Sequence, residues 1–159
     1  MPETKLKPDT ILSILIAIFA TIASAGGLLL DGLYRDNAFV TTTWLGNDAI
    51  TLFLAVPILI AAMIISNRGS LKAQLIWMGA LDYMLYNYAF YLFGAAFNWF
   101  FLLYAALLAL SIFALIFGLI KLDVNGISQQ FRKDAPVKWI GGYFIFVASG
   151  LGLVYLIQS

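Results

Sequence analysis

Five long apolar stretches constrain this chain more than any other feature of its sequence. Each is bounded by charged residues, Gly, Pro or Asn, and each has about 20 residues, the length of helix that crosses a hydrocarbon core of about 30 Å. Backbone amides in lipid must bond within their own segment, so stretches joined by such short links must be helices. The stretches cover residues 11–30, 49–66, 73–93, 99–120 and 139–157.

The composition agrees with a membrane location. Hydrophobic residues make up 63% of the 159 residues and charged residues only 11%, which is far more apolar than a soluble domain. We therefore expect an all-α integral membrane protein, in which a single domain of five transmembrane helices has the lipid bilayer as its first partner. The expected location is a cell membrane, crossed several times.

The residue types that are missing exclude much chemistry. The chain has no Cys and no His, which rules out disulfides, zinc-thiolate sites, iron–sulfur clusters and any use of histidine as a ligand or a base. We predict no cofactor, no metal site and no catalytic residue. A net charge of +1 offers no basic surface for a nucleic acid.

The positions of Lys and Arg predict the orientation, because positive residues are retained on the cytoplasmic side. Of nine basic residues, only Arg35 falls on the opposite side, in the loop 31–48. This pattern predicts a cytoplasmic N-terminus, an outer loop 31–48 and an extracytoplasmic C-terminus. The link 121–138 is then cytoplasmic, and either a short helix on the membrane surface or a plain polar loop fits it. The eight residues on the cytoplasmic side are Lys5, Lys7, Arg68, Lys72, Lys121, Arg132, Lys133 and Lys138.

The first stretch, residues 11–30, can also be interpreted as part of a signal peptide, and it carries small residues along one side. Residues 1–25 have the form of a cleavable signal peptide, although the apolar run continues to Leu30 and so favours a span. Small residues recur along one side of it at helical spacing, and such residues let membrane helices pack closely, either within the chain or in a homo-oligomer. They are Ser13, Ala17, Ala20, Ser24 and Gly27.

In the second stretch, Pro57 predicts a kink. Proline has no backbone N–H, so the Phe53 carbonyl is left without its helical donor.

One group of residues on the third stretch could carry chemistry. Asp82 lies near the middle of this stretch, where a carboxylate costs about 2.5 to 3.5 kcal/mol unless it faces protein or water. No basic residue lies in any of the five stretches to neutralise it. We therefore predict that Asp82 is either protonated and hydrogen-bonded or ionised beside a bound cation, with Tyr83, Tyr86 and Asn87 shaping the site. Two alternatives remain open: Asp82 ties two helices together, and the tyrosines form an interfacial aromatic belt.

Above this predicted site lies the acidic outer loop. Asp31, Asp36 and Asp48 are expected at its mouth, where their charge would attract cations. The alternative is that the loop is merely polar and that Asp48 caps the second helix.

Four short segments resemble stretches found in small uncharacterised multi-pass membrane proteins of prokaryotes. The resemblance covers about the middle third of the chain and implies a membrane location, which would be a prokaryotic plasma membrane, but no activity and no functional residue. The segments are Arg68-Gly69-Ser70-Leu71, Trp77-Met78-Gly79-Ala80-Leu81, Tyr86-Asn87-Tyr88 and Phe101-Leu102-Leu103-Tyr104.

Three functions remain open on the sequence. The first is a small transport or binding protein in which Asp82 holds a proton, a cation or a small molecule. The second is an accessory or assembly subunit that pairs with a membrane partner. A membrane enzyme is third, because no nucleophile–base pair is visible in the sequence.

Overall fold

The computed structural model describes residues 7–130, 138–139, 141–143, 145–146 and 149. These residues are almost entirely helical, and no β-strand occurs among them. The chain divides into two compact units, Met1–Asp123 and Val124–Ser159. The second unit contains the short helix α6 (Val124–Gln130). These seven residues of the link 121–138 are thus helical, and their location on a membrane surface stays a prediction.

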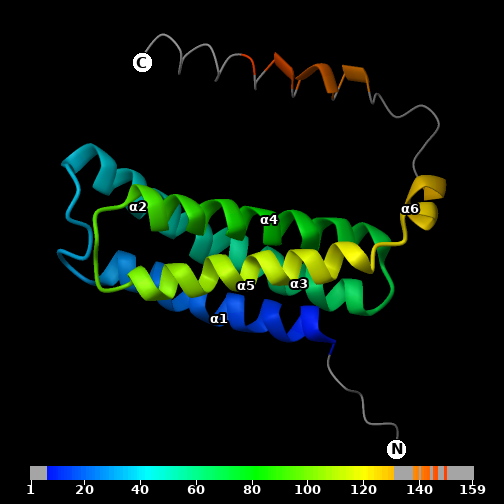
Figure 1. Ribbon diagram of the computed structural model, residues 1–159, viewed down its shortest axis with the longest axis horizontal. Helices are drawn as coiled ribbons and strands as arrows, with labels where there is room; N and C mark the ends of the chain where they lie inside the picture. Colours follow the sequence, from blue (N-terminus) through cyan, green and yellow to red (C-terminus); the bar gives the residue numbers. More distant parts are fainter. Residues whose placement is uncertain (1–6, 131–137, 140, 144, 147–148, 150–159) are drawn as a thin grey trace, which may run out of the picture. The chain divides into compact units, whose positions relative to one another are not determined.

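The first unit is an antiparallel helical bundle (Figure 1). Helix α1 packs along α5, α5 along α4, and α4 along α3, which also contacts α1 and so closes the ring. Helices α2, η1 and α3 run on without a break as one rod of 30 residues, so the bundle has four rods. The elements are α1 (Pro8–Leu29), α2 (Ala38–Ile50), η1 (Thr51–Ala55), α3 (Val56–Asn67), α4 (Leu71–Gly94) and α5 (Phe101–Ile120).

The number of spans differs from the predicted five. Within the described residues, three helices are long and apolar enough to cross a membrane: α1, the rod Ala38–Asn67, and α5. Helix α4 is equally long, but Lys72, Gln74, Asp82 and Asn87 make it more polar than the others. Most of the predicted span 139–157 lies outside the described residues. The all-helical class and a membrane-type bundle are therefore confirmed, and the number five is not.

The second rod begins much earlier than the predicted residue 49. Asn37 ends the preceding loop and caps α2, because its side-chain oxygen accepts a hydrogen bond of 3.0 Å from the Val40 amide. The predicted outer loop 31–48 therefore shrinks to residues 30–37, and Asp48 lies inside a helix instead of capping one. We call the end of the bundle formed by residues 30–37 and 95–100 the Tyr34 end, and the opposite one the Lys121 end.

The helix geometry changes close to Pro57, where the sequence predicts a kink. Pro57 stands in the first turn of α3, and residues Thr51–Ala55, which end one residue before the Val56–Pro57 pair begins α3, form a π-helix, η1, in place of regular α-helix. The kink itself stays a prediction. Proline donates no backbone hydrogen bond, so the wider turn redistributes the carbonyls ahead of it. The π-turn begins at Thr51, whose side chain is fully buried.

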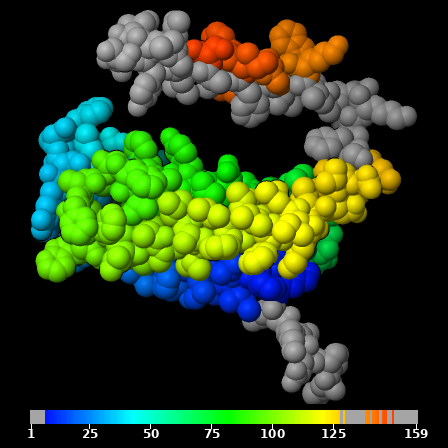
Figure 2. All heavy atoms as spheres, viewed as in Figure 1, coloured from blue at the N-terminus to red at the C-terminus, as the bar shows by residue number. Residues whose placement is uncertain are grey.

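Close packing at small residues holds the bundle together. All five small residues of the α1 face are buried within the unit, which supports the packing of this face inside the chain. Figure 2 shows α5 seated between α1 and α4 on one side of the bundle. Midway along the axis, large apolar side chains with no exposed surface form what we call the dry layer, made of Ile16, Leu59, Leu81, Met84 and Leu107.

Polar contacts tie the helices at the Lys121 end. The Lys121 ammonium lies 2.7 Å from Asp9 Oδ1, and the Asp9 side chain is 5% exposed while that of Lys121 is 41% exposed. One turn further in, the Trp77 indole donates to Ser13 Oγ at 3.0 Å. The start of α1 is thus fixed to the end of α5 and to α4.

Replacing Lys121 by Met should leave the buried Asp9 carboxylate without its charged donor. We expect the free energy of unfolding in mild detergent to fall by about 1–3 kcal/mol, the usual cost of losing a hydrogen bond to a buried charged group. Lys72→Met removes an exposed lysine from α4 and should change it by less than about 0.5 kcal/mol. Equal losses in the two variants would contradict a stabilising role for the Asp9–Lys121 pair.

Candidate functional site

The buried carboxylate of this bundle is Asp48. It lies on α2 near the Tyr34 end and is only 3% exposed. Because α2 already runs as a helix from Ala38, Asp48 is placed about three turns inside it, where it faces α1, α4 and Tyr34 of the loop between α1 and α2. No Lys or Arg among the described residues forms an ion pair with it. A desolvated carboxylate without a cation must rely on hydrogen bonds.

Two tyrosines supply those hydrogen bonds. The Tyr34 hydroxyl lies 2.5 Å from Asp48 Oδ2, and the Tyr91 hydroxyl lies 3.0 Å from Oδ1. Tyr34 comes from the loop between α1 and α2, and Tyr91 from the last turns of α4. Burial, together with nearby Tyr91 and the Asp48 carboxylate, raises the pKa of Tyr34 far above its ordinary value. Tyr34 therefore keeps its proton and acts as a donor.

The position of Tyr91 allows Asp48 to hold or release a proton. The Tyr91 hydroxyl lies 3.1 Å from the Trp44 carbonyl as well as 3.0 Å from Asp48 Oδ1. When Asp48 is ionised, Tyr91 can donate to it. When Asp48 is protonated, it can donate to Tyr91, whose own proton then goes to the Trp44 carbonyl. Either state leaves the hydroxyl and the carboxyl group paired, so the contacts do not force one charge state.

Gly27 brings the backbone of α1 against this carboxylate. A β-carbon at this position would overlap Asp48 Oδ2 and lie 2.6 Å from the Tyr34 hydroxyl. Only glycine lets α1 approach so closely. The small-residue face of α1 therefore has a second role beside helix packing, which is to make room for the Asp48–Tyr34 pair.

Further buried hydroxyls surround the pair. Tyr88, Tyr91 and Tyr104 form a cluster of rings, with Tyr91 and Tyr104 centred 5.0 Å apart and Tyr88 and Tyr104 centred 6.2 Å apart. Among the described residues, four buried hydroxyls have no partner in hydrogen-bonding geometry: those of Ser24 on α1, Tyr88 on α4, and Tyr104 and Ser111 on α5. Each such group costs about 1–3 kcal/mol if it stays unpaired. Ser24, Tyr88 and Tyr104 lie close enough to Asp48 to interact with its carboxylate electrostatically.

A second polar contact lies one turn further in, at the π-helix. Thr51 Oγ1 lies 2.9 Å from the Tyr83 hydroxyl and accepts from the Asn87 side-chain amide at 3.4 Å. The wide turn of η1 begins at this threonine. Asp48 and Thr51 on the second rod thus face Tyr91, Asn87 and Tyr83 on α4, and together they form a polar seam between the two rods.

The structure places the four predicted site residues, Asp82, Tyr83, Tyr86 and Asn87, on two different sides of α4. Tyr83 and Asn87 point inward and meet at Thr51, as above. Asp82 and Tyr86 lie on the outward side of α4, where Asp82 is exposed and Tyr86 is 67% exposed. The four residues therefore do not form one site. The reason is rotational: Asp82 and the inward Tyr91 are nine residues apart, which is about 180° around the helix at 100° per residue.

The three acidic residues of the predicted mouth are also separated. Asp31 is exposed in the loop, whereas Asp48 is buried. Asp36 fixes the loop to the α4–α5 link, because its carboxylate accepts the Ala96 amide at 3.1 and 3.2 Å and the Trp44 indole at 3.1 Å. Within the described residues, no three acidic side chains come together in a way that could hold a metal ion.

Sequence reasoning missed most of this site, and the signals for it were weak. Asp48 follows Trp44 by one helical turn and precedes Thr51 by another, which would place all three on one helical face had α2 been recognised. The loop position of Tyr34 gave no signal at all. Tyr88, Tyr91 and Tyr104 lie in stretches rich in aromatic residues, where most tyrosines only pack against neighbours, so the sequence did not distinguish them as site residues.

Gly27→Ala should disrupt the site without changing its polar groups. The added methyl group would displace the Asp48 carboxylate from Tyr34, and we expect unfolding to become easier by about 1–3 kcal/mol, as for other overpacked positions. Gly46→Ala is the matched control: a β-carbon on that helical glycine meets nothing within 4 Å. It should be neutral or stabilising by up to about 1 kcal/mol. A harmless Gly27→Ala, measured by denaturation in the same detergent, would contradict the close approach.

No protein family, no curated protein and no solved structure matches the chain. The resemblance of four short segments to small prokaryotic membrane proteins therefore remains an expectation from the sequence.

Proposed function

We propose that this chain is a multi-pass membrane protein that binds a proton or a small monovalent cation at Asp48. The observation that carries the proposal is the burial of this carboxylate at 3% exposure with tyrosine hydroxyls, rather than a basic residue, as its partners. Burial without a counter-charge is costly, and sites of this kind in membrane proteins commonly serve proton or ion binding. The sequence suggested Asp82 as the residue that holds a proton or cation, and we assign this role to Asp48 instead.

The choice of a proton or monovalent ion follows from the ligands. One carboxylate and several neutral hydroxyls carry at most a single negative charge, which a proton or a monovalent cation neutralises. A divalent ion prefers several carboxylates, and no group of three or more acidic side chains that could hold one occurs among the described residues. The unpartnered hydroxyls of Ser24, Tyr88 and Tyr104 are further oxygen donors for such a guest.

Access to the site is proposed from one side only. Asp48 and Tyr34 lie at the Tyr34 end, which the distribution of Lys and Arg predicts to be extracytoplasmic. The dry layer separates them from the Lys121 end, and its five side chains have no exposed surface. In this conformation a guest would enter and leave by the same end. That arrangement supports a binding or sensing role over conduction through the bundle.

Infrared spectroscopy of the purified protein in lipid tests the proposal. The carbonyl band of a protonated carboxyl group should titrate with pH, and one slowly deuterating component should disappear in Asp48→Asn, because Asp48 is shielded from water. Asp31→Asn removes an exposed loop carboxyl group and should remove only a fast-exchanging component. If Na⁺ or K⁺ suppresses the slow component at constant pH, the guest is a cation that competes with the proton.

The proposal fails if Asp48→Asn removes no slowly exchanging carboxyl band and changes neither proton uptake nor the response to Na⁺ and K⁺. Tyr91→Phe serves as a second variant that keeps the carboxylate and the ring. It should leave the protein folded and change the pH dependence of the same band, since the hydroxyl that pairs with both charge states is lost.

A further inference from the structure

The outward side of α4 has features that the Asp48 site does not use. Its exposed residues recur every three or four positions along the whole helix, so they form one continuous stripe. We call this stripe the α4 face. It consists of Leu75, Ile76, Gly79, Asp82, Tyr86, Phe90 and Phe93.

Asp82 lies at the centre of the α4 face. It is eleven residues from Leu71 and twelve from Gly94, so it is midway along a helix of 24 residues. Helix α4 packs against α3 and α5, both of which belong to helices apolar enough to span a membrane. If α4 crosses the membrane beside these helices, Asp82 is expected at mid-membrane depth. Its side chain is exposed, and no helix of the first unit covers it. A carboxylate in that position requires a protein partner rather than acyl chains.

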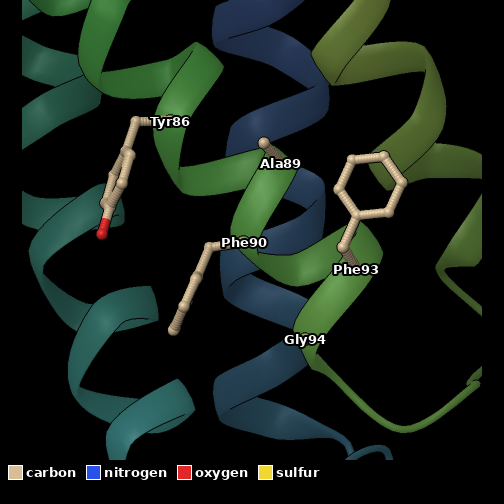
Figure 3. Close-up of a pocket in the computed structure, with 5 residues that line it drawn as sticks. All are labelled: Tyr86, Ala89, Phe90, Phe93 and Gly94. Carbon is tan, nitrogen blue, oxygen red and sulfur yellow. The ribbon is translucent and has the colours of Figure 1, made fainter. Parts of the chain in front are cut away.

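The α4 face has the shape of a helix-docking surface. Gly79 stands one turn before Asp82, and a β-carbon there would meet nothing within 4 Å, so a second helix could approach its backbone closely. Beyond Asp82 lies a shallow apolar groove formed by Tyr86, Ala89, Phe90, Phe93 and Gly94. The side chains of Tyr86 and Phe90 project to one side of α4 and that of Phe93 projects to the other, so the groove runs between them along the helix surface (Figure 3).

Charge complementarity identifies the partner. All nine Lys and Arg residues of the chain lie outside the five apolar stretches, and there is no His. A second copy would bring another Asp82 to this depth, not a cation. We infer that the α4 face binds a transmembrane helix of a different protein, and that this helix carries a Lys or Arg at mid-membrane depth that pairs with Asp82.

A synthetic transmembrane peptide provides a defined probe. A Leu-rich helix with one central Lys, and an identical helix with Leu at that position, are labelled and reconstituted with the full chain in lipid vesicles. Energy transfer should report at least tenfold tighter association of the Lys peptide. Asp82→Asn and Asp82→Leu should abolish this preference, and Asp31→Leu, which removes an exposed loop carboxylate, should keep it. Moving the Lys by one turn toward either end should weaken it.

Cross-linking locates the contact, because the chain has no native Cys. A cysteine placed next to the Lys of the peptide should form a disulfide with Tyr86→Cys on the α4 face. It should not do so with Phe113→Cys, which is on the outward side of α5 and is exposed to a similar extent, 55% against 67%. Asp82 and Tyr86 lie on the surface of the first unit, so their replacement leaves its core intact.

Three results would overturn the inference. The first is equal association of the Lys and Leu peptides with the wild-type chain. The second is a disulfide between two copies through Tyr86→Cys, which would assign the face to a homodimer. The third is a disulfide between Tyr86→Cys and a second cysteine within residues 139–157 of the same chain, which would give the face an occupant from its own sequence.

Discussion

The pairing of Asp48 with Tyr34 and Tyr91 is the interaction on which the rest of this structure depends. It joins the loop after α1 to α2 and α2 to α4, through one carboxylate that no basic side chain neutralises within the described part of the chain. Gly27 permits the close approach of α1 that the pair requires. A buried polar group of this kind is stable only while every partner is present. The same requirement underlies the proposed sensitivity of the site to a proton or a small cation.

The two ends of the bundle use charge differently. At the Lys121 end, Asp9 is neutralised by a lysine that is itself 41% exposed, so the pair anchors α1 to α5 at the edge of the bundle. At the Tyr34 end, Asp48 is held by neutral hydroxyls deep within it. Between them lie the five apolar side chains of the dry layer, with the Thr51–Tyr83 hydrogen bond and the buried Ser111 hydroxyl beside them. The carboxylate that anchors α1, Asp9, and the carboxylate proposed to bind a proton or cation, Asp48, therefore lie at opposite ends of the bundle and have different partners.

Much of the fold followed from the sequence, because hydrophobic length and backbone hydrogen bonding leave few choices in a membrane. The helices over residues 11–30, 73–93 and 99–120, the small-residue face of α1 and the disturbance at Pro57 were all predictable on those grounds. The start of α2 was not, since Thr41, Thr42 and Thr43 are typical of a loop. In the structure their hydroxyls bond to backbone carbonyls of the preceding turn, which lets the helix continue to Ala38.

The candidate site was less predictable than the fold, and the two aspartates show why. Position along a helix can be read from the sequence, and Asp82 does lie midway along α4; its depth in a membrane stays a prediction. Direction around the helix depends on which neighbours pack against it, and this turned Asp82 outward and Asp48 inward. The consequence is two separate hypotheses, a binding site at Asp48 and a partner contact at Asp82.

A double-mutant cycle on Asp48 and Tyr91 tests the central interaction most directly. Unfolding free energies are measured in the same lipid or detergent for the wild type, Asp48→Asn, Tyr91→Phe and the double variant. If the two side chains are paired inside the bundle, the cycle should give a coupling energy of about 1–3 kcal/mol. Additive effects, within about 0.5 kcal/mol, would contradict the account.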